Sequence, residues 1–327
     1  RRDVRDAKKL GQYIVEEKLG EGGMGKVYRA QHGMLKRPTA IKLLGADRNT
    51  PEDLDRFRRE VQMTAKLKHP NTVTIYDYGR TDDGTFYYAM ELLDGVTLVE
   101  VVLVDGPQPE ARVLHILQQC AMALHEAHEM GLVHRDIKPN NIMLTEQGGV
   151  HDVTKVLDFG LVKNIGPSTD ATNTVSEAII GTPRFMSPEQ ILDPPSIDAR
   201  SDLYALGAVG YYLLTGDFVF EGTNAIEICA QHLSAEPELP SRRVENEIDP
   251  ELELLIMQCL EKKREDRPET ALEIARRLEA LAVGRWSQEN AAQWWSTIGR
   301  GIVMMRGEEI GVGSLATIQA GPMESST

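Results

Sequence analysis

The sequence has no long apolar segment and little positive charge. No run of about 18 apolar residues occurs, and the charged N-terminus, residues 1–5, lacks a signal-peptide core. We therefore expect a cytoplasmic chain whose given residues make no membrane contact, without excluding an anchor outside them. Its 36 Lys and Arg stand against 50 Asp and Glu, a formal net charge of −14. Nucleic acids and anionic membranes need a basic surface, so neither is an expected partner.

Cysteine is scarce as well. Cys120, Cys229 and Cys259 lie far apart among apolar neighbours, and no CxxC spacing appears. This pattern favours reduced, mostly buried thiols and gives no sign of a metal or disulfide framework. What the sequence does have is an ordinary core-forming composition, 41% hydrophobic and 26% charged. Its 327 residues predict one large or two modest globular units.

The first part of the chain has strand character. β-branched and aromatic residues between turn residues favour a meander of antiparallel strands, interrupted by one segment with helical spacing of apolar residues. The expected strands are 13–19, 27–30, 39–44, 73–76 and 86–90, and the expected helix is 51–68. This predicts a small, sheet-rich unit with one helix.

From about residue 96 the pattern is mostly helical. The expected helices are 109–129, 202–215, 251–259 and 270–281, of which 202–215 is apolar nearly all round and therefore suits a buried position. The polar stretch 164–176 reads as a long loop. Residues 284–327 lose regular periodicity and are expected to be a partly ordered tail or linker, although its three Trp residues suggest that some of it docks.

A glycine cluster at residues 20–25 has the spacing GxGxxG and is followed by Val27. Dinucleotide-binding folds use the same string, but they need a helix directly after it. Here the chain continues into strand-forming residues 26–30, which argues against an NAD-dependent oxidoreductase. Glycines between paired strands let backbone approach triphosphate oxygens without Cβ clashes. A plain Gly-rich hairpin turn remains the alternative.

Two charged residues elsewhere in this unit are candidates for phosphate binding. Lys42 lies on the third expected strand, where it would hold the α- and β-phosphates of a nucleotide if a carboxylate oriented it. Glu60, in the middle of the expected helix, is the candidate carboxylate. An edge Lys that snorkels to solvent and a solvated helix Glu are the ordinary alternatives.

The most specific motif is residues 134–144, His-Arg-Asp-Ile-Lys-Pro-Asn-Asn-Ile-Met-Leu. Asp-Phe-Gly follows at 158–160, and Ser-Pro-Glu stands at 187–189. With these motifs the chain resembles the protein kinase superfamily, and specifically the bacterial eukaryotic-like Ser/Thr protein kinases, over about residues 10–283. The resemblance implies a bilobal α+β fold. The small antiparallel lobe, 13–91, would bind ATP, and the larger, mainly helical lobe, 92–283, would carry catalysis and substrate binding, followed by the tail 284–327.

The resemblance also implies the chemical roles. Asp136 would accept the proton of the substrate hydroxyl, and Lys138 would neutralise the γ-phosphate. Asn141 and Asp158 would supply hard oxygen ligands for Mg²⁺, with Mn²⁺ as an alternative. Lys42, paired with Glu60, would grip the α/β-phosphates.

The expected adenine site lies between the lobes. The segment 89–95 matches the family's inter-lobe linker, so Met90 would be the gatekeeper and the backbone of Glu91 and Leu93 would meet the adenine edge. The remaining nucleotide contacts implied by the alignment are Leu19, Gly20, Gly22, Gly25, Val27, Ala40 and Met143.

Two residues favour Ser/Thr over Tyr as the acceptor. Lys138, two residues after Asp136, is typical of Ser/Thr members, and Thr182 in such kinases bridges the catalytic Asp and Lys. Arg135 indicates control by phosphorylation of the activation loop, because a phosphate would give its guanidinium a bidentate partner. The expected phosphosites are Thr174 first, then Ser176 and Thr172. Autophosphorylation there would use a transient homodimer.

Three further matches are expected to be structural. Asp202 resembles the buried helix Asp that binds the catalytic-loop backbone, and Arg267 resembles the partner of the Glu189 carboxylate. Loss of activity on changing Glu189 or Arg267 would report on folding, because breaking a buried ion pair costs roughly 3–5 kcal/mol.

Two rival functions remain on the sequence alone. A pseudokinase scaffold would normally lack one of Lys42, Asp136, Asn141 and Asp158, and none is missing. A small-molecule phosphotransferase is disfavoured by the Gly-Thr-Pro and Ser-Pro-Glu segments, which shape a protein-substrate platform. A radiolabel transfer assay would discriminate between them.

Overall fold

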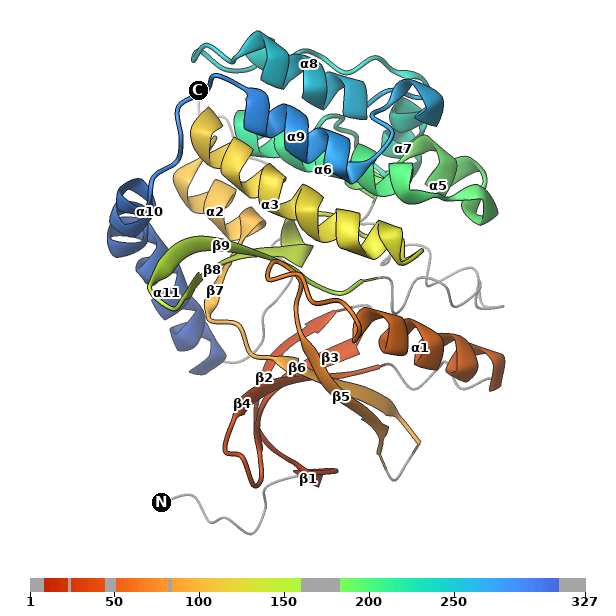
Figure 1. Ribbon diagram of the computed structural model, residues 1–327, viewed down its shortest axis with the longest axis vertical. Helices are drawn as coiled ribbons and strands as arrows, with labels where there is room; N and C mark the ends of the chain where they lie inside the picture. The colour runs from red at the N-terminus through yellow and green to blue at the C-terminus, as the bar shows by residue number, and fades with distance from the viewer. Residues whose placement is uncertain (1–8, 23–24, 45–50, 82–83, 160–182, 312–327) are drawn as a thin grey trace, which may run out of the picture.

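The computed structural model describes residues 9–22, 25–44, 51–81, 84–159 and 183–311. Its small lobe is a six-stranded antiparallel sheet in the order β1-β2-β3-β4-β6-β5 (Figure 1). The strands are β1 (Lys9–Leu10), β2 (Tyr13–Gly22), β3 (Gly25–His32), β4 (Pro38–Leu43), β5 (Ile75–Arg80) and β6 (Phe86–Glu91). The expected strand at 73–76 therefore begins two residues later and runs further.

One helix, α1 (Pro51–Thr64), accompanies this sheet. It ends at Thr64, four residues before the end expected from the sequence. Val61 on its last turn is fully buried and packs with Ile75, Phe86 and Tyr88 of the sheet. The small lobe thus buries one face of the sheet against a single amphipathic helix.

A second, three-stranded sheet lies where the sequence predicted mainly helix. Its strands β7 (Gly95–Thr97), β8 (Ile142–Gln147) and β9 (Val150–Val156) pair in the order β7-β8-β9. The expectation of a mostly helical pattern was too simple here, because strands this short give almost no periodicity to read. This sheet matters for function, since it carries the segments that flank the catalytic motifs.

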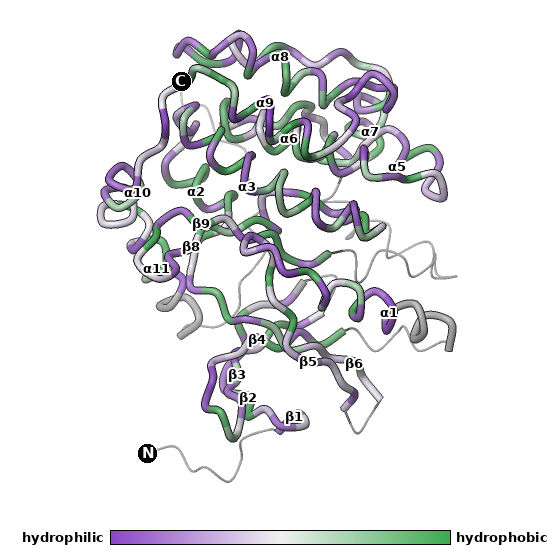
Figure 2. The backbone as a smooth tube through the Cα atoms, viewed as in Figure 1, coloured by the Kyte–Doolittle hydropathy of each residue, from purple (hydrophilic) through white to green (hydrophobic). Residues whose placement is uncertain are grey.

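The large lobe is built around α6 (Ala199–Thr215), in which every residue from Ser201 to Thr215 is buried. Figure 2 shows hydrophobic stretches in the interior around α6 and hydrophilic residues toward the rim of the lobe. The surrounding helices are α2 (Leu98–Asp105), α3 (Glu110–Glu129), α5 (Pro188–Leu192), α7 (Ala225–Ser234), α8 (Pro250–Cys259) and α9 (Ala271–Ala280). The expected helices at 109–129, 202–215, 251–259 and 270–281 correspond to α3, α6, α8 and α9.

The segment after α9 is helical and docked. It forms α10 (Gln288–Trp294), a π-helical turn (Trp295–Gly299) and α11 (Arg300–Gly311). Figure 1 shows α10 and α11 on the flank of the large lobe formed by α2 and the β7-β8-β9 sheet, with α11 running toward the small lobe. The sequence suggested docking from the Trp residues but did not predict these helices.

The expected fold class is confirmed. An antiparallel β-lobe and a mainly helical lobe meet at the linker between β6 and β7, as the resemblance implied. Within the described part of the chain, no helix combines the length and the apolar character needed to span a bilayer.

Candidate active site

The catalytic loop connects α3 to β8 and is fixed by one buried carboxylate. Asp202 of α6 accepts hydrogen bonds from the backbone N–H of His134 at 2.7 Å and of Arg135 at 2.8 Å. His128 Nε2 lies 2.8 Å from the same carboxylate. Burial opposes ionisation of Asp202, but His128, His134 and their hydrogen bonds outweigh it and lower its pKa. The charged form of Asp202 therefore sets the path of the loop.

That loop is bent through an unusual backbone conformation. Arg135 has a φ of 65°, in the left-handed region that non-glycine residues seldom adopt. Its backbone N–H donates a hydrogen bond to Asp202, and its backbone carbonyl accepts one from Gln190 Nε2 at 3.0 Å. Because contacts on both sides hold this residue, the strained turn persists and leaves Asp136 at the end of the loop.

Asp136, Lys138 and Asn141 form one cluster beyond the turn. Lys138 Nζ lies 2.9 Å from Asp136 Oδ2, and Asn141 Nδ2 donates to the same oxygen at 2.9 Å. Asn141 also donates to the Asp136 backbone carbonyl at 2.8 Å. The Asp136 side chain is almost fully buried, so its carboxylate has a fixed position beside an ammonium group.

Asp158 follows β9 and faces the small lobe. Like Arg135, it has a left-handed backbone, with a φ of 54°. Its Oδ2 lies 2.7 Å from Lys42 Nζ on β4, and its Oδ1 accepts a hydrogen bond of 2.6 Å from the Tyr88 hydroxyl on β6. Burial raises the pKa of Asp158, but Lys42 and Tyr88 outweigh burial and leave it lowered. Both carboxylate oxygens are therefore engaged by small-lobe residues.

Tyr88 was missed by the sequence reasoning. Tyr88 lies opposite Lys42 in the β4–β6 register, so neighbouring strands present both side chains to one carboxylate. Burial and the adjacent Asp158 raise the pKa of Tyr88 well above its usual value, so the hydroxyl is the donor. A Tyr in an apolar strand is normally predicted to be a core residue. The one sign of a further role is that a buried Tyr hydroxyl needs a hydrogen-bond partner.

The sequence predicts an ion pair between Lys42 and Glu60. The ion pair of Lys42 is with Asp158, and burial leaves little solvent to screen the two charges. Glu60 lies half-buried on α1 and makes interactions of its own. The pairing of Lys42 with Glu60 and a nucleotide-gripping role for Glu60 both stay predictions.

Most of the nucleotide-contact candidates belong to the sheet that carries Lys42, and Leu93 and Met143 lie outside it. Val27 lies opposite Lys42 on β3, and Ala40 lies opposite Met90. Met143 on β8 lies opposite Thr97 on β7, so it belongs to the three-stranded sheet of the large lobe. Leu19, Gly20 and Gly22 are on β2, Glu91 ends β6, and Leu93 is in the linker.

Gly25 illustrates why the flap is rich in glycine. It has a φ of 133°, and a Cβ there would collide with the Leu43 carbonyl. Only glycine fits this close approach of β3 to the end of β4. The flap residues Gly23 and Met24, together with Thr172, Thr174, Ser176 and Thr182, lie outside the described residues.

The Ser-Pro-Glu segment is tied to the body of the large lobe. Glu189 makes a two-pronged ion pair with Arg267, at 2.7 and 2.8 Å, and accepts from Ser201 Oγ at 2.6 Å. Burial opposes the charge of Glu189, but Arg267 and Ser201 lower its pKa to about 2. The pair holds α5 beside α6, as expected for a structural contact.

The residues that face the cleft fit a divalent cation bound with a nucleotide. In the described residues no group of three His, Cys, Asp or Glu could hold a metal alone. Asn141 and Asp158 instead offer one amide oxygen and one carboxylate, which suits Mg²⁺ that takes its other ligands from water and phosphates. The donor set therefore fits a nucleotide-bound cation better than a dedicated protein cage.

The comparisons with known proteins identify the family of the chain. Residues 13–277 match the family model of the protein kinase domain. The chain therefore belongs to the protein kinase family, whose members use ATP and a divalent cation, and the resemblance read from the motifs is confirmed.

Among curated proteins, the chain is 39% identical over 284 residues to the serine/threonine-protein kinase pkn3 of Myxococcus xanthus, covering 86% of this chain and 52% of that protein. It is 40% identical over 267 residues to PknB of Mycobacterium leprae, covering 80% and 42%. The chain thus spans about half the length of the curated relatives it matches. Among solved structures, the PknI kinase domain of Mycobacterium tuberculosis matches with a TM-score of 0.65 at 25% identity, covering 85% of this chain and 99% of that one.

Proposed function

We propose that this chain transfers the γ-phosphoryl group of ATP to Ser or Thr hydroxyls of other proteins. The observation that carries the proposal is the cluster of Asp136, Lys138 and Asn141, in which one carboxylate is held by an ammonium and an amide at 2.9 Å each. Phosphoryl transfer needs little covalent help from the protein, so fixed charges and positioning supply most of the catalysis.

Each residue of the cleft then has a distinct task. Asp136 orients the acceptor hydroxyl and takes its proton, while Lys138 stabilises negative charge on the transferred group. Lys42 approaches the phosphates from β4 once it exchanges its present partner, Asp158, for them. Asp158 and Asn141 would hold the cation, which would neutralise charge on the phosphates.

The acceptor class is inferred from the surroundings of Asp136. A small concavity beside it is lined by Lys138, Phe185, Met186 and Gln190. A short acceptor side chain suits so small a recess, and the relatives are named as serine/threonine kinases. Mg²⁺ as the particular ion, the phosphosites on 172–176, a transient homodimer and a cytoplasmic location remain predictions from the sequence.

The test is a transfer assay with radiolabelled ATP, Mg²⁺ and a generic protein acceptor, followed by phosphoamino-acid analysis. We expect label on Ser and Thr, and a loss of about 10²-fold or more in Asp136→Asn, because the proton acceptor is removed. Arg300→Gln, an exposed change on the tail, is the matched control and should keep full activity. Equal labelling by wild type and Asp136→Asn, or label confined to Tyr, would refute the proposal.

Activation-loop control needs a separate measurement. Intact-mass analysis of recombinant protein should show added phosphates, mapped by fragmentation to the loop that contains Thr174. They should be absent in Asp136→Asn if the chain phosphorylates itself. Unchanged phosphate in that variant would assign the modification to another kinase.

A further inference from the structure

The docked tail begins where the family match ends. The match closes at residue 277, whereas ordered helices continue to α11. Trp294, Trp295 and Ile302 of this segment are buried against the large lobe. Gly299 allows the close packing, because a Cβ there would come within 2.7 Å of the Trp294 ring and 2.8 Å of the Trp295 ring.

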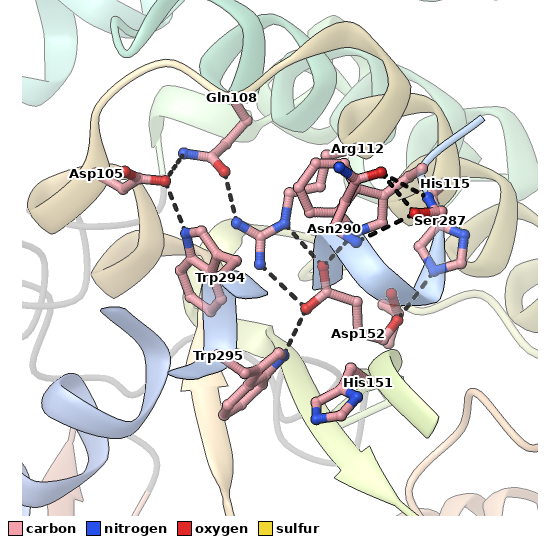
Figure 3. Close-up of polar contacts among 12 residues, drawn as sticks. Asp105, Gln108, Arg112, His115, His151, Asp152, Ser287, Asn290, Trp294 and Trp295 are labelled. Carbon is pink, nitrogen blue, oxygen red and sulfur yellow. Dashed lines mark hydrogen bonds and ion pairs between the residues drawn. The ribbon is translucent and has the colours of Figure 1, made fainter. Parts of the chain in front are cut away.

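The near end of the tail is anchored at a buried carboxylate of β9. Asp152 is fully buried and forms an ion pair with Arg112 of α3, at 2.8 Å from Nε and 3.1 Å from Nη2. The indole N–H groups of Trp286 and Trp295 donate to the two oxygens of the same carboxylate, at 2.8 and 2.7 Å. Figure 3 shows Trp295 and Arg112 converging on Asp152 from different elements.

The anchor is extended by two further contacts. The Arg112 guanidinium lies over the Trp294 ring, 3.7 Å from its centroid, and Trp294 Nε1 donates to Asp105 at 2.8 Å (Figure 3). A desolvated guanidinium on an indole face is attracted by the ring electrons and so strengthens this packing. Tail, α2, α3 and β9 are therefore joined at one buried cluster.

The far end of the tail reaches the inter-lobe linker. Arg306 of α11 donates from Nη1 to the Gly95 carbonyl at 3.1 Å and from Nε and Nη2 to Glu100 Oε1 at 3.0 and 2.6 Å. Glu100 also completes the capping box of α2 with Thr97. One guanidinium thus ties together the end of the linker, the first turn of α2 and α11.

Gly95 occupies a sensitive position. It starts β7, whose Thr97 lies opposite Met143 on the expected adenine wall. A Cβ at Gly95 would collide with the Leu144 carbonyl, so β7 lies tightly on β8. The other end of the linker is held by Glu91, which accepts from Lys155 Nζ at 2.9 Å and from the Thr74 N–H at 2.8 Å.

We propose that residues 286–306 form a strap that fixes the end of the inter-lobe linker, and that Arg306 is a positioning residue for the nucleotide site. The inference rests on the proposed ATP-dependent function, which it deepens. Arg306 touches no reacting atom. It acts through Gly95 and Glu100, which it holds in the arrangement that receives the adenine.

The expected consequence is a change in nucleotide affinity and little change in turnover. A linker that is already fixed loses little conformational entropy when the nucleotide binds. A loosened linker must be ordered on binding, and this loss of entropy weakens the affinity. Loss of the Arg306 contacts should therefore weaken nucleotide binding, while the Asp136 cluster, held by α6, keeps its geometry.

The test compares two arginines of the same helix in the full chain. Calorimetry with Mg·ATP should give a dissociation constant about fivefold higher in Arg306→Gln than in wild type, in the usual range for coupled sites. Arg300→Gln is the matched control, because Arg300 is largely exposed and its ion pair within the described part of the chain is a distant one, 3.9 Å from Glu146. It should bind like wild type. Arg306→Lys should recover part of the affinity, since an ammonium can pair with Glu100 but lacks the fork that also reaches Gly95.

Kinetics then separate positioning from general damage. Arg306→Gln should raise KM for ATP by the same factor and leave kcat and KM for the protein acceptor unchanged. Equal affinities for Arg306→Gln and Arg300→Gln would overturn the inference, as would a fall in kcat alone. Because nucleotide binding is measured without transfer, a wild-type chain that binds Mg·ATP but labels no acceptor would count against the proposed function only.

Discussion

Two buried carboxylates hold the large lobe together in different ways. Asp202 of α6 accepts from the catalytic-loop backbone and from His128, all within residues 13–277 that match the kinase family. Asp152 of β9 pairs with Arg112 and accepts from two tryptophans beyond that match. Both carboxylates are at most 1% exposed. One therefore fixes the catalytic loop, and the other fastens an added segment to the same lobe.

The same substitution at both positions should separate these roles. Asp202→Asn and Asp152→Asn each leave buried donors without a charged acceptor, at a cost of about 3–5 kcal/mol in unfolding free energy. Only Asp202→Asn should also lower kcat sharply, because the backbone of His134 and Arg135 loses its acceptor. Urea unfolding and transfer kinetics on both variants provide the check. A comparable fall in kcat in Asp152→Asn would mean that the tail anchor also shapes the catalytic loop.

The Glu189–Arg267 pair, which lies beside α6 as Asp202 does, should make the stability of this part of the large lobe depend on pH. The pKa of Glu189 is lowered from 4.5 to about 2, so its stabilisation is present above about pH 4.5 and is lost as pH falls toward 2. A shift of this size corresponds to about 3 kcal/mol. Glu189→Gln should therefore be less stable than wild type at pH 6, and the difference should shrink between pH 5 and pH 3. A difference independent of pH would show that packing, not charge, holds α5.

At the anchor of the tail, loss of one indole N–H donor should lower the unfolding free energy less than loss of the Asp152 carboxylate that both tryptophans share. Trp295→Phe keeps an aromatic ring but removes one hydrogen bond to the Asp152 carboxylate, at a cost of about 2 kcal/mol. Trp286→Phe removes the equivalent bond from a half-buried position and should cost less, because water can replace the donor. Thermal unfolding of the two variants measures the difference. Equal losses would indicate that burial of the tryptophans does not decide the strength of the anchor.

The comparison also shows what the sequence could predict. Asp136, Asn141 and Asp158 belong to short motifs with specific spacing, so they could be proposed as site residues without tertiary information. The Asp152 cluster joins residues from positions 112 to 295 that no local pattern links. Asp152 moreover turns inward through a left-handed backbone with a φ of 54°, which a strand pattern does not predict. The tryptophans signalled docking, but the partner carboxylate could only be found in three dimensions.

A third carboxylate, Asp158, is intermediate in predictability. Its motif could be recognised in the sequence, but its contact with Tyr88 could not. Tyr88→Phe removes the 2.6 Å hydrogen bond to Oδ1 and leaves the Lys42 contact in place. We expect the Mg²⁺ concentration for half-maximal transfer to rise about threefold, which corresponds to the net loss of one hydrogen bond of roughly 0.6 kcal/mol. The matched control is Tyr78→Phe, whose exposed hydroxyl contacts only Gln62 at 3.3 Å among the described residues. If Tyr88→Phe instead lowered the Mg²⁺ requirement, the Tyr88 hydroxyl would compete with the cation for Asp158. The small lobe would then restrain the Asp158 carboxylate, whereas α6 supports the catalytic loop through Asp202.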